Sequence, residues 1–369
     1  MNKRYRADQV GSLLRPSELI QARTALSNGQ MSLEQLRKIE DRAILDALQL
    51  QRETGVEVFT DGEFRRGSFM GDLAEAVEGF VLDTGEREWR GPGASTKRGA
   101  FGRVVGAKLR QTRRLTVHES VFLREHSLGA FKITIPSPSL LAFVAYKPGL
   151  TSRFYPARLD LLRALTEIIS AEITLLAGEG VPYIQLDAPV YTYYADPKFL
   201  DRMRFDGIDP DQSLEEAIAA DNACLEAASR HEVTLGIHLC RGNSRSSWLA
   251  EGSYDPIAEK LFGSLKADRF LLEYDNERSG GFAPLRFVPK GKSVALGLIT
   301  TKAGELELQD ELLRRIEEAS AFVSLENLAI SPQCGFASSA PGNLISYDAQ
   351  RRKLELVADT ARKVWGENR

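Results

Sequence analysis

Residues 32–61 read SLEQLRKIEDRAILDALQLQRETGVEVFTD. The pattern Ser32-x-x-Gln35 is a capping box, which predicts the start of a helix, and apolar residues at helical spacing follow it. Gly55 is suited to end that helix in a left-handed conformation, and the apolar segment 56–61 follows at once as a predicted strand. A helix that leads directly into a buried strand indicates an α/β fold with a parallel sheet.

The same alternation of helix and strand continues along the chain and yields eight predicted strands. These are RADQVGS (6–12), VEVFTD (56–61), FKITIPSP (131–138), YIQLDAP (183–189), TLGIHLC (234–240), RFLLEYD (269–275), SVALGLIT (293–300) and LAISPQC (328–334). Eight such units predict a closed (β/α)8 barrel, the TIM barrel. An open doubly wound sheet is the competing arrangement, but it favours a Gly-rich phosphate turn, and no GxGxxG or GxxxxGK[ST] motif occurs.

Two stretches depart from this alternation. Residues 86–130 are rich in Arg and Gly and contain the alternating pieces GRVVGAKLR and RLTVHESVF, which predict a β-hairpin insertion after the second strand. Residues 198–212 are predicted as a polar loop, followed by a helix that begins at Ser213. No linker or repeat divides the chain, so a single domain over residues 1–369 is expected.

Composition and charge exclude several classes of function. The chain has 48 Lys plus Arg against 51 Asp plus Glu, a net charge of −3, so no basic field is present to bind nucleic acid. No run of about 18 apolar residues could cross a membrane, and the N-terminus lacks a secretory signal. Three cysteines cannot form a paired disulfide framework, so a cytoplasmic location is expected. The sequence nominates no protein partner.

Metal-binding residue types lie at the ends of three predicted strands. His238 and Cys240 are two apart on one strand and would share a face, the next strand carries Glu273, and Cys334 ends the last. Gly335 allows a sharp turn beside a ligand. Because barrel enzymes assemble their sites at the carboxyl ends of the strands, these four groups are predicted to hold one Zn²⁺, which thiolate and imidazole ligands favour.

The alternative is that these side chains belong to the core. Cys240 and Cys334 would then be inert buried thiols, and His238 a hydrogen-bonded core histidine. Cys224 lies within a predicted amphipathic helix and is interpreted in that way.

Zinc with two thiolates could bind a substrate thiol as a further sulfur ligand, which predicts alkylation of sulfur. Glu273 would be the exchangeable ligand that leaves, so it and Asp187 are the predicted catalytic carboxylates. Other predicted strand ends suit an amino-acid substrate. Glu63 and Asp187 would bind its ammonium group, and the Ser12 hydroxyl its carboxylate. Arg65 is a candidate contact, with a solvated ion pair as the alternative.

The sequence also resembles the catalytic C-terminal domain of cobalamin-independent methionine synthases, in its shorter stand-alone branch. The matching pieces are VGSLLRP (10–16), VFTDGEFRR (58–66), IQLDAPVY (184–191), GIHLCRGN (236–243), FLLEYDNERSG (270–280) and SPQCGF (331–336). The resemblance implies that His238, Cys240, Glu273 and Cys334 bind zinc, and that Ser12, Glu63 and Asp187 hold homocysteine. It implies transfer of a methyl group from a methyltetrahydrofolate to the homocysteine thiolate, which forms methionine.

Three positions depart from that family's pattern. Ala188 replaces a Glu, residues 298–302 read LITTK where the family has a His, and the segment SPSLLAFVAYK lacks the family's tryptophan. A corrinoid therefore remains an alternative methyl donor.

Two other functions remain open at this point. The first is a zinc-dependent thiol alkyltransferase of the epoxyalkane:coenzyme M transferase type, in which Arg65, Arg66 or Arg241 would bind the sulfonate. The second is a non-catalytic barrel that binds zinc and thiol without turnover.

Overall fold

A parallel sheet of six strands lies at the centre of the computed structural model, which describes residues 5–83, 85–91, 96–99 and 102–366. The strand order is β10–β9–β8–β7–β6–β5. All residues of these strands are buried except Ser293, as expected where helices cover a parallel sheet. The strands are β5 (Lys132–Pro136), β6 (Tyr183–Asp187), β7 (Thr234–Leu239), β8 (Arg269–Glu273), β9 (Ser293–Ile299) and β10 (Leu328–Pro332).

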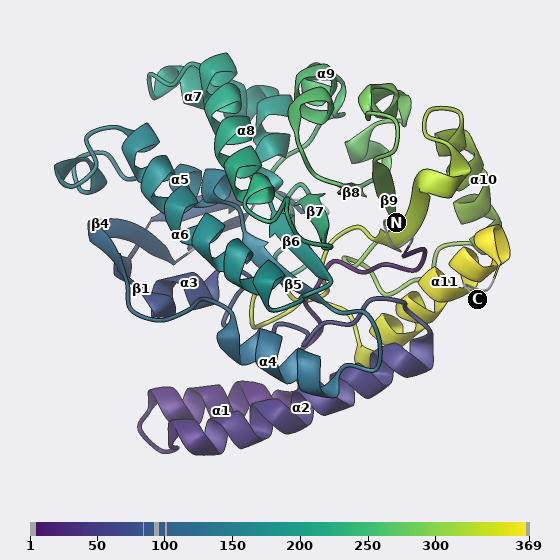
Figure 1. Cartoon of the computed structure of the whole chain (residues 1–369), viewed down its shortest axis with the longest axis horizontal. Coiled ribbons are helices and arrows are strands. Elements are labelled where there is room, and N and C mark those ends of the chain that lie inside the picture. The colour runs from purple at the N-terminus through teal and green to yellow at the C-terminus, as the bar shows by residue number, and fades with distance from the viewer. Residues whose placement is uncertain (1–4, 84, 92–95, 100–101, 367–369) are drawn as a thin grey trace.

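Helices lie around the outside of this sheet (Figure 1). They are α1 (Ser17–Ser27), α2 (Leu33–Thr54), α3 (Gly71–Ala76), α4 (Val117–His126), α5 (Pro138–Ala145), α6 (Arg158–Gly178), α7 (Pro197–Phe205), α8 (Pro210–Glu226), α9 (Asp255–Ser264), α10 (Gln309–Ser320) and α11 (Tyr347–Trp365). Figure 1 shows α1 and α2 side by side, and the C-terminal helix α11 contacts both α2 and β10. The C-terminal helix therefore packs against an early helix of the chain.

The first two predicted strands, 6–12 and 56–61, are only bridged to their neighbours. Ala7 forms a single parallel bridge with Ile330 of β10, and Phe59 forms one with Phe131, which precedes β5. A backbone hydrogen bond of 2.9 Å from Glu57 N to the Ala7 carbonyl joins the two segments. The predicted TIM-barrel class is confirmed, but the sheet has six fully formed strands rather than eight. In the described part of the chain, the predicted closure of the barrel is represented only by isolated bridges.

Side chains explain why these two segments do not extend into strands. The amide oxygen of Gln51 on α2 accepts a hydrogen bond from Thr60 N at 2.8 Å, and its NH₂ group donates to Thr60 O at 2.8 Å. The Asp8 carboxylate accepts from the next backbone amide, Gln9 N, at 2.8 Å. Buried side chains thus satisfy backbone groups that a neighbouring strand would otherwise pair with.

Helix boundaries follow local capping chemistry. At α2 the Ser32 side chain accepts a hydrogen bond from Gln35 N, and the Gln35 side chain accepts one from Ser32 N. Gly55 follows the helix at φ 81°, and both features are as predicted. The prediction that the helix after the polar loop 198–212 begins at Ser213 is wrong. Asp209 caps α8 instead, with Pro210 in the first turn, and part of the predicted polar loop before it forms helix α7.

The insertion contains a pair of nested antiparallel hairpins. Strand β1 (Val77–Leu82) pairs with β4 (Arg103–Gln111), and β2 (Glu86–Trp89) pairs with β3 (Thr96–Gly99) between them. These strands begin before residue 86 and end at residue 111, earlier than the predicted range of 86–130. The piece RLTVHESVF, predicted as extended, lies largely in helix α4, and Glu172 of α6 accepts hydrogen bonds from Leu115 N and Thr116 N just before it.

Among the residues that the structure describes, no helix has both the length and the apolar character that a bilayer crossing requires.

Candidate metal centre and substrate pocket

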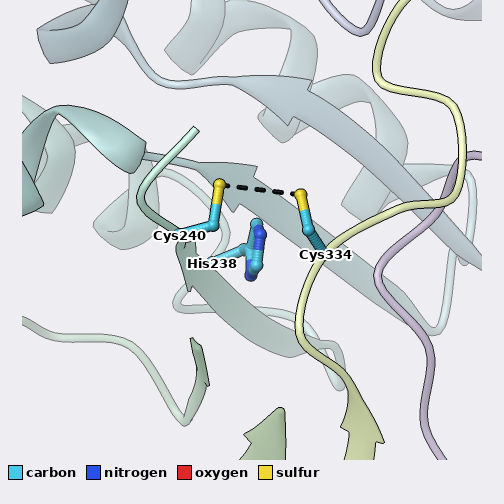
Figure 2. A group of neighbouring side chains, drawn as sticks. All are labelled: His238, Cys240 and Cys334. Atoms are coloured by element: carbon cyan, nitrogen blue, oxygen red, sulfur yellow. Dashed lines mark hydrogen bonds between the residues drawn. The ribbon is translucent and has the colours of Figure 1, made fainter. Parts of the chain in front are cut away.

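Three of the predicted metal ligands meet at the carboxyl end of the sheet. His238 lies near the end of β7, Cys240 follows that strand directly, and Cys334 follows β10 (Figure 2). One ligand atom from each residue lies within 4.8 Å of the others, and the two sulfur atoms are 3.6 Å apart. Residues 94 positions apart in the chain therefore form one compact group of soft ligands.

The imidazole of His238 has the tautomer that a metal ligand requires. Its Nδ1 lies 3.2 Å from the carbonyl oxygen of Leu271, and since a carbonyl can only accept, Nδ1 must carry the proton. Nε2 then presents a lone pair, and this buried atom has no hydrogen-bond partner among the described residues. A buried nitrogen without a partner is costly, and a cation at this position would satisfy it.

The two thiols do not ionise alike. Contact with Cys240, together with the nearby His238, holds the pKa of the Cys334 thiol well below its usual value. The same contact, reinforced by burial, raises the pKa of Cys240. One thiolate is therefore favoured before any ion binds, and a thiolate is the form that coordinates metal.

The structure does not place Glu273, the fourth predicted ligand, in this group of three. Its Oε2 accepts a hydrogen bond from Arg241 N at 2.6 Å, and its Oε1 accepts one from Arg278 Nη2 at 2.7 Å. Burial opposes ionisation of this carboxyl, but the charges of Lys302, Arg278 and Arg241 outweigh it and lower its pKa to about 2. Glu273 is thus an ionised carboxylate engaged by its own neighbours.

A pocket opens beside the metal-ligand group and contains most of the predicted substrate contacts. Its volume is about 490 Å³, including its opening to solvent. Ser12, Glu63 and Asp187 line it together with the two cysteines and His238. The remaining lining residues are Val10, Phe69, Trp89, Pro189, Tyr193, Gly242, Asn243, Gly335 and Ser338.

Two buried carboxyl groups give the pocket its character. Oε1 of Glu63 accepts from the Thr134 hydroxyl at 3.0 Å, whereas Oε2 has no partner among the described residues. Asp187 accepts from Gln185 Nε2 at 2.8 Å. Burial raises the pKa of Glu63, and it raises that of Asp187 to about 7. A bound cation such as an ammonium group would favour the ionised forms of both.

Ser12 occupies its place because residue 335 is glycine. A Cβ atom on Gly335 would lie 2.0 Å from the Ser12 hydroxyl oxygen, closer than any real contact. The absent side chain lets the turn after Cys334 pass directly over Ser12, whose hydroxyl accepts from Ala337 N at 3.3 Å. The sequence predicted a sharp turn beside a ligand at Gly335, and the neighbour that the structure shows there is the Ser12 side chain.

The structure directs Arg65 away from the pocket. Its guanidinium donates to Asp41 at 2.6 Å and Glu40 at 3.4 Å, both on α2, and stacks over the ring of Phe122. Arg65 therefore forms ion pairs, as the alternative held, but it is only 7% exposed rather than solvated.

Arg66 and Arg241 also make internal contacts. Arg66 donates to both carboxylate oxygens of Glu119 and to the Thr134 carbonyl. Arg241 donates to the carbonyl oxygens of Gly252 and Glu273. These contacts position loops, and they occupy the arginines proposed for a sulfonate.

Four residues near the site were not predicted from the sequence. Asn243 lies three positions after Cys240, within the motif GIHLCRGN, and its place there was the one available signal. Lys302 follows β9, Tyr193 follows β6, and Trp89 comes from β2 of the insertion. Nothing in the sequence around Trp89 indicates that the insertion reaches the pocket.

The fold and the site together define an α/β-barrel protein with a Cys–Cys–His group at the carboxyl ends of its strands, open to a pocket that contains two carboxyls. The family model for the catalytic domain of cobalamin-independent synthases matches residues 7–130 and 152–361. The chain belongs to this family.

Similar proteins agree with this assignment. The uncharacterized protein YxjG of Bacillus subtilis is 39% identical over 98% of this chain and 95% of its own length. The methionine synthase of Pyrococcus abyssi is 24% identical over 88% of this chain and 84% of its own. A solved structure from Listeria monocytogenes, provisionally named a vitamin-B12-independent methionine synthase, has a TM-score of 0.75 and 30% identity, with both chains fully covered.

Proposed function

We propose that this protein is a zinc-dependent methyltransferase that converts homocysteine to methionine. One observation carries the proposal: two thiols 3.6 Å apart, beside a histidine with a free buried nitrogen, face a pocket that holds two carboxyl groups. Membership of the cobalamin-independent methionine synthase family supports methyl transfer to homocysteine.

The donor set fits zinc. Two cysteine sulfurs and Nε2 of His238 supply three soft or borderline ligands within 4.8 Å of one another, which leaves a tetrahedral ion one position for an exchangeable group. Zinc bound there would lower the pKa of a substrate thiol and keep it as a nucleophilic thiolate at neutral pH. We retain Glu273 as the exchangeable fourth ligand; Arg241 N and Arg278 donate hydrogen bonds to its two carboxylate oxygens.

The pocket residues would orient the amino-acid part of the substrate. Glu63 and Asp187 would bind the ammonium group, and the free Oε2 of Glu63 is the acceptor that such a group would satisfy. Ser12, beside the turn that follows Cys334, would contact the carboxylate. Contacts to both ends of the amino-acid group would place the substrate sulfur next to the cysteines. They would also orient that sulfur for in-line attack on the methyl carbon of the donor. The donor remains open between a methyltetrahydrofolate and a methyl corrinoid.

The contacts of the three candidate arginines favour this reading over a coenzyme M transferase. Arg65, Arg66 and Arg241 are all engaged by carboxylates or carbonyls of the protein itself. A sulfonate would have to displace those partners, whereas the two carboxyl groups of the pocket suit an ammonium group.

Metal analysis and methionine formation test the proposal in the same preparations. The wild-type protein, loaded and desalted, is expected to hold about one zinc ion per chain. Cys334→Ala and Cys240→Ala are expected to lose both the zinc and the activity, because each removes one of the two thiolate ligands. Cys224→Ala is the matched control, since that thiol is buried on α8 against Ser170. Metal-replete wild-type protein without bound zinc would refute the proposal.

A further inference from the structure

The loop after β9 makes a direct contact with the loop that follows Cys240. Lys302 Nζ donates to the carbonyl oxygen of Gly242 at 3.3 Å and to Oδ1 of Asn243 at 3.2 Å. Gly242 and Asn243 themselves line the pocket. The ammonium group of Lys302 is therefore held next to the metal-ligand group by two neutral acceptors.

Asn243 extends this contact to the other cysteine. Its Nδ2 donates to the carbonyl oxygen of Gly335 at 2.7 Å and to the Thr301 hydroxyl at 3.3 Å. Gly335 is the residue directly after Cys334, and Asn243 lies three residues after Cys240. A single buried amide thus ties together the two loops that carry the cysteines, across 92 positions of sequence.

Lys302 adds a positive charge beside a group of buried acidic side chains. Cys240, Cys334 and Glu273 are all buried, and each is or becomes an anion when the site functions. Arg278 and Arg241 both donate hydrogen bonds to Glu273, and in the described part of the chain neither donates one to Cys240 or Cys334. Adjacent buried anions need a compensating cation, and Lys302 is placed to provide it.

We propose that Lys302 and Asn243 act as positioning residues for the metal centre. Asn243 would hold the two cysteine loops at the spacing that one ion requires. Lys302 would balance the single net negative charge that remains when two cysteine thiolates and a substrate thiolate surround one Zn²⁺. This inference rests on the proposed zinc site. Neither side chain needs to touch the substrate for this role.

The test measures zinc affinity by competition with a chromophoric chelator, and the absorption spectrum of the cobalt-substituted protein. Lys302→Met and Asn243→Ala are each expected to weaken zinc binding by roughly 10–100-fold, the usual effect of losing an outer-shell partner. Both should shift the sulfur-to-cobalt absorption bands. Lys302→Arg keeps the charge and should recover most of the affinity. Lys266→Met is the matched control, because Lys266 is an exposed lysine paired with Glu226.

Each outcome supports or overturns the inference. Wild-type affinity and spectra in both Lys302→Met and Asn243→Ala would overturn it while leaving the zinc proposal intact. Equal weakening by Lys302→Arg and Lys302→Met would overturn the charge role. If Lys302→Met fails to fold by circular dichroism, Lys302→Gln, which removes the charge but keeps a donor, replaces it. A wild-type protein that binds no zinc would overturn this inference together with the proposed function.

Discussion

Gly335 contacts both the metal-ligand group and the substrate pocket. It follows Cys334, its carbonyl accepts from Asn243, and its missing side chain leaves the space that the Ser12 hydroxyl occupies. A single methyl group at this position would therefore disturb the cysteine loop and the substrate side together.

We expect Gly335→Ala to lower the free energy of unfolding by about 1–3 kcal/mol, the usual cost of overpacking a dense site. The new Cβ would lie 2.0 Å from the Ser12 oxygen, so one of the two loops must move. Urea denaturation would measure the loss. Gly178→Ala is the control: no atom lies within 4 Å of its Cβ position at the end of α6, so its stability should be unchanged or slightly higher. Equal denaturation midpoints for wild type and Gly335→Ala would contradict the prediction.

At the scale of elements, a buried carboxyl on α8 joins the segments behind the substrate pocket. Asp221 accepts hydrogen bonds of 2.7 Å from the hydroxyls of Ser139 on α5 and Tyr191. Tyr191 belongs to the 3₁₀ helix Pro189–Ala195, which directly follows the strand that ends at Asp187. Burial raises the pKa of Asp221 to about 6.

This shift predicts a pH dependence with a defined sign. Between an unfolded pKa of 3.8 and a folded pKa of about 6, the folded state keeps the proton that the unfolded state has lost. The free energy of unfolding therefore falls as pH rises through this window, by up to about 3 kcal/mol from this one group. Asp221→Asn removes the titration.

Urea denaturation at pH 4, 5, 6 and 7 would therefore show the free energy of unfolding of Asp221→Asn rising relative to that of the wild type as the pH increases. Other buried carboxyls, such as Asp61, remain in both proteins, so their contributions cancel in the comparison. Parallel curves for the two proteins would contradict the assignment.

At the scale of the whole molecule, the insertion completes a pocket whose other walls come from the barrel. Trp89 of β2 is 5% exposed and lines the pocket. The next residue, Arg90, exchanges backbone hydrogen bonds of 2.8 and 2.9 Å with Trp248 and forms an ion pair of 2.8 Å with Asp196. The insertion is thus attached to the barrel beside the substrate pocket.

We expect Trp89→Ala to retain its zinc and to lose turnover by roughly 10–100-fold. The three ligands come from barrel segments, so metal content should not change, whereas an enlarged pocket would admit water and orient the substrates poorly. Glu88→Ala is the matched control, because Glu88 is exposed on the opposite face of the same strand. Zinc content and methionine formation would be measured on each protein. Unchanged turnover in Trp89→Ala would exclude a role for the insertion in the pocket.

Local chemistry made part of the fold predictable. The capping box of Ser32 and the left-handed Gly55 act within a few residues, so the ends of α2 could be read directly. The segments 6–12 and 56–61 have the composition of strands but remain bridges. In the second segment, the side chain of Gln51 on helix α2 forms hydrogen bonds with the backbone of Thr60 in place of a neighbouring strand. The sequence of the segment itself cannot reveal a partner that comes from a helix.

Periodicity and residue types at strand ends were sufficient to indicate a parallel α/β barrel and to nominate His238, Cys240 and Cys334. Parallel strands bring their carboxyl ends to one edge, so a position along each strand already implies which groups are neighbours. Tertiary structure decided where the longer charged side chains point, because that depends on partners from distant segments. In the folded protein Arg65 pairs with Asp41 on α2, Arg278 donates a hydrogen bond to Glu273, and Trp89 lines the pocket.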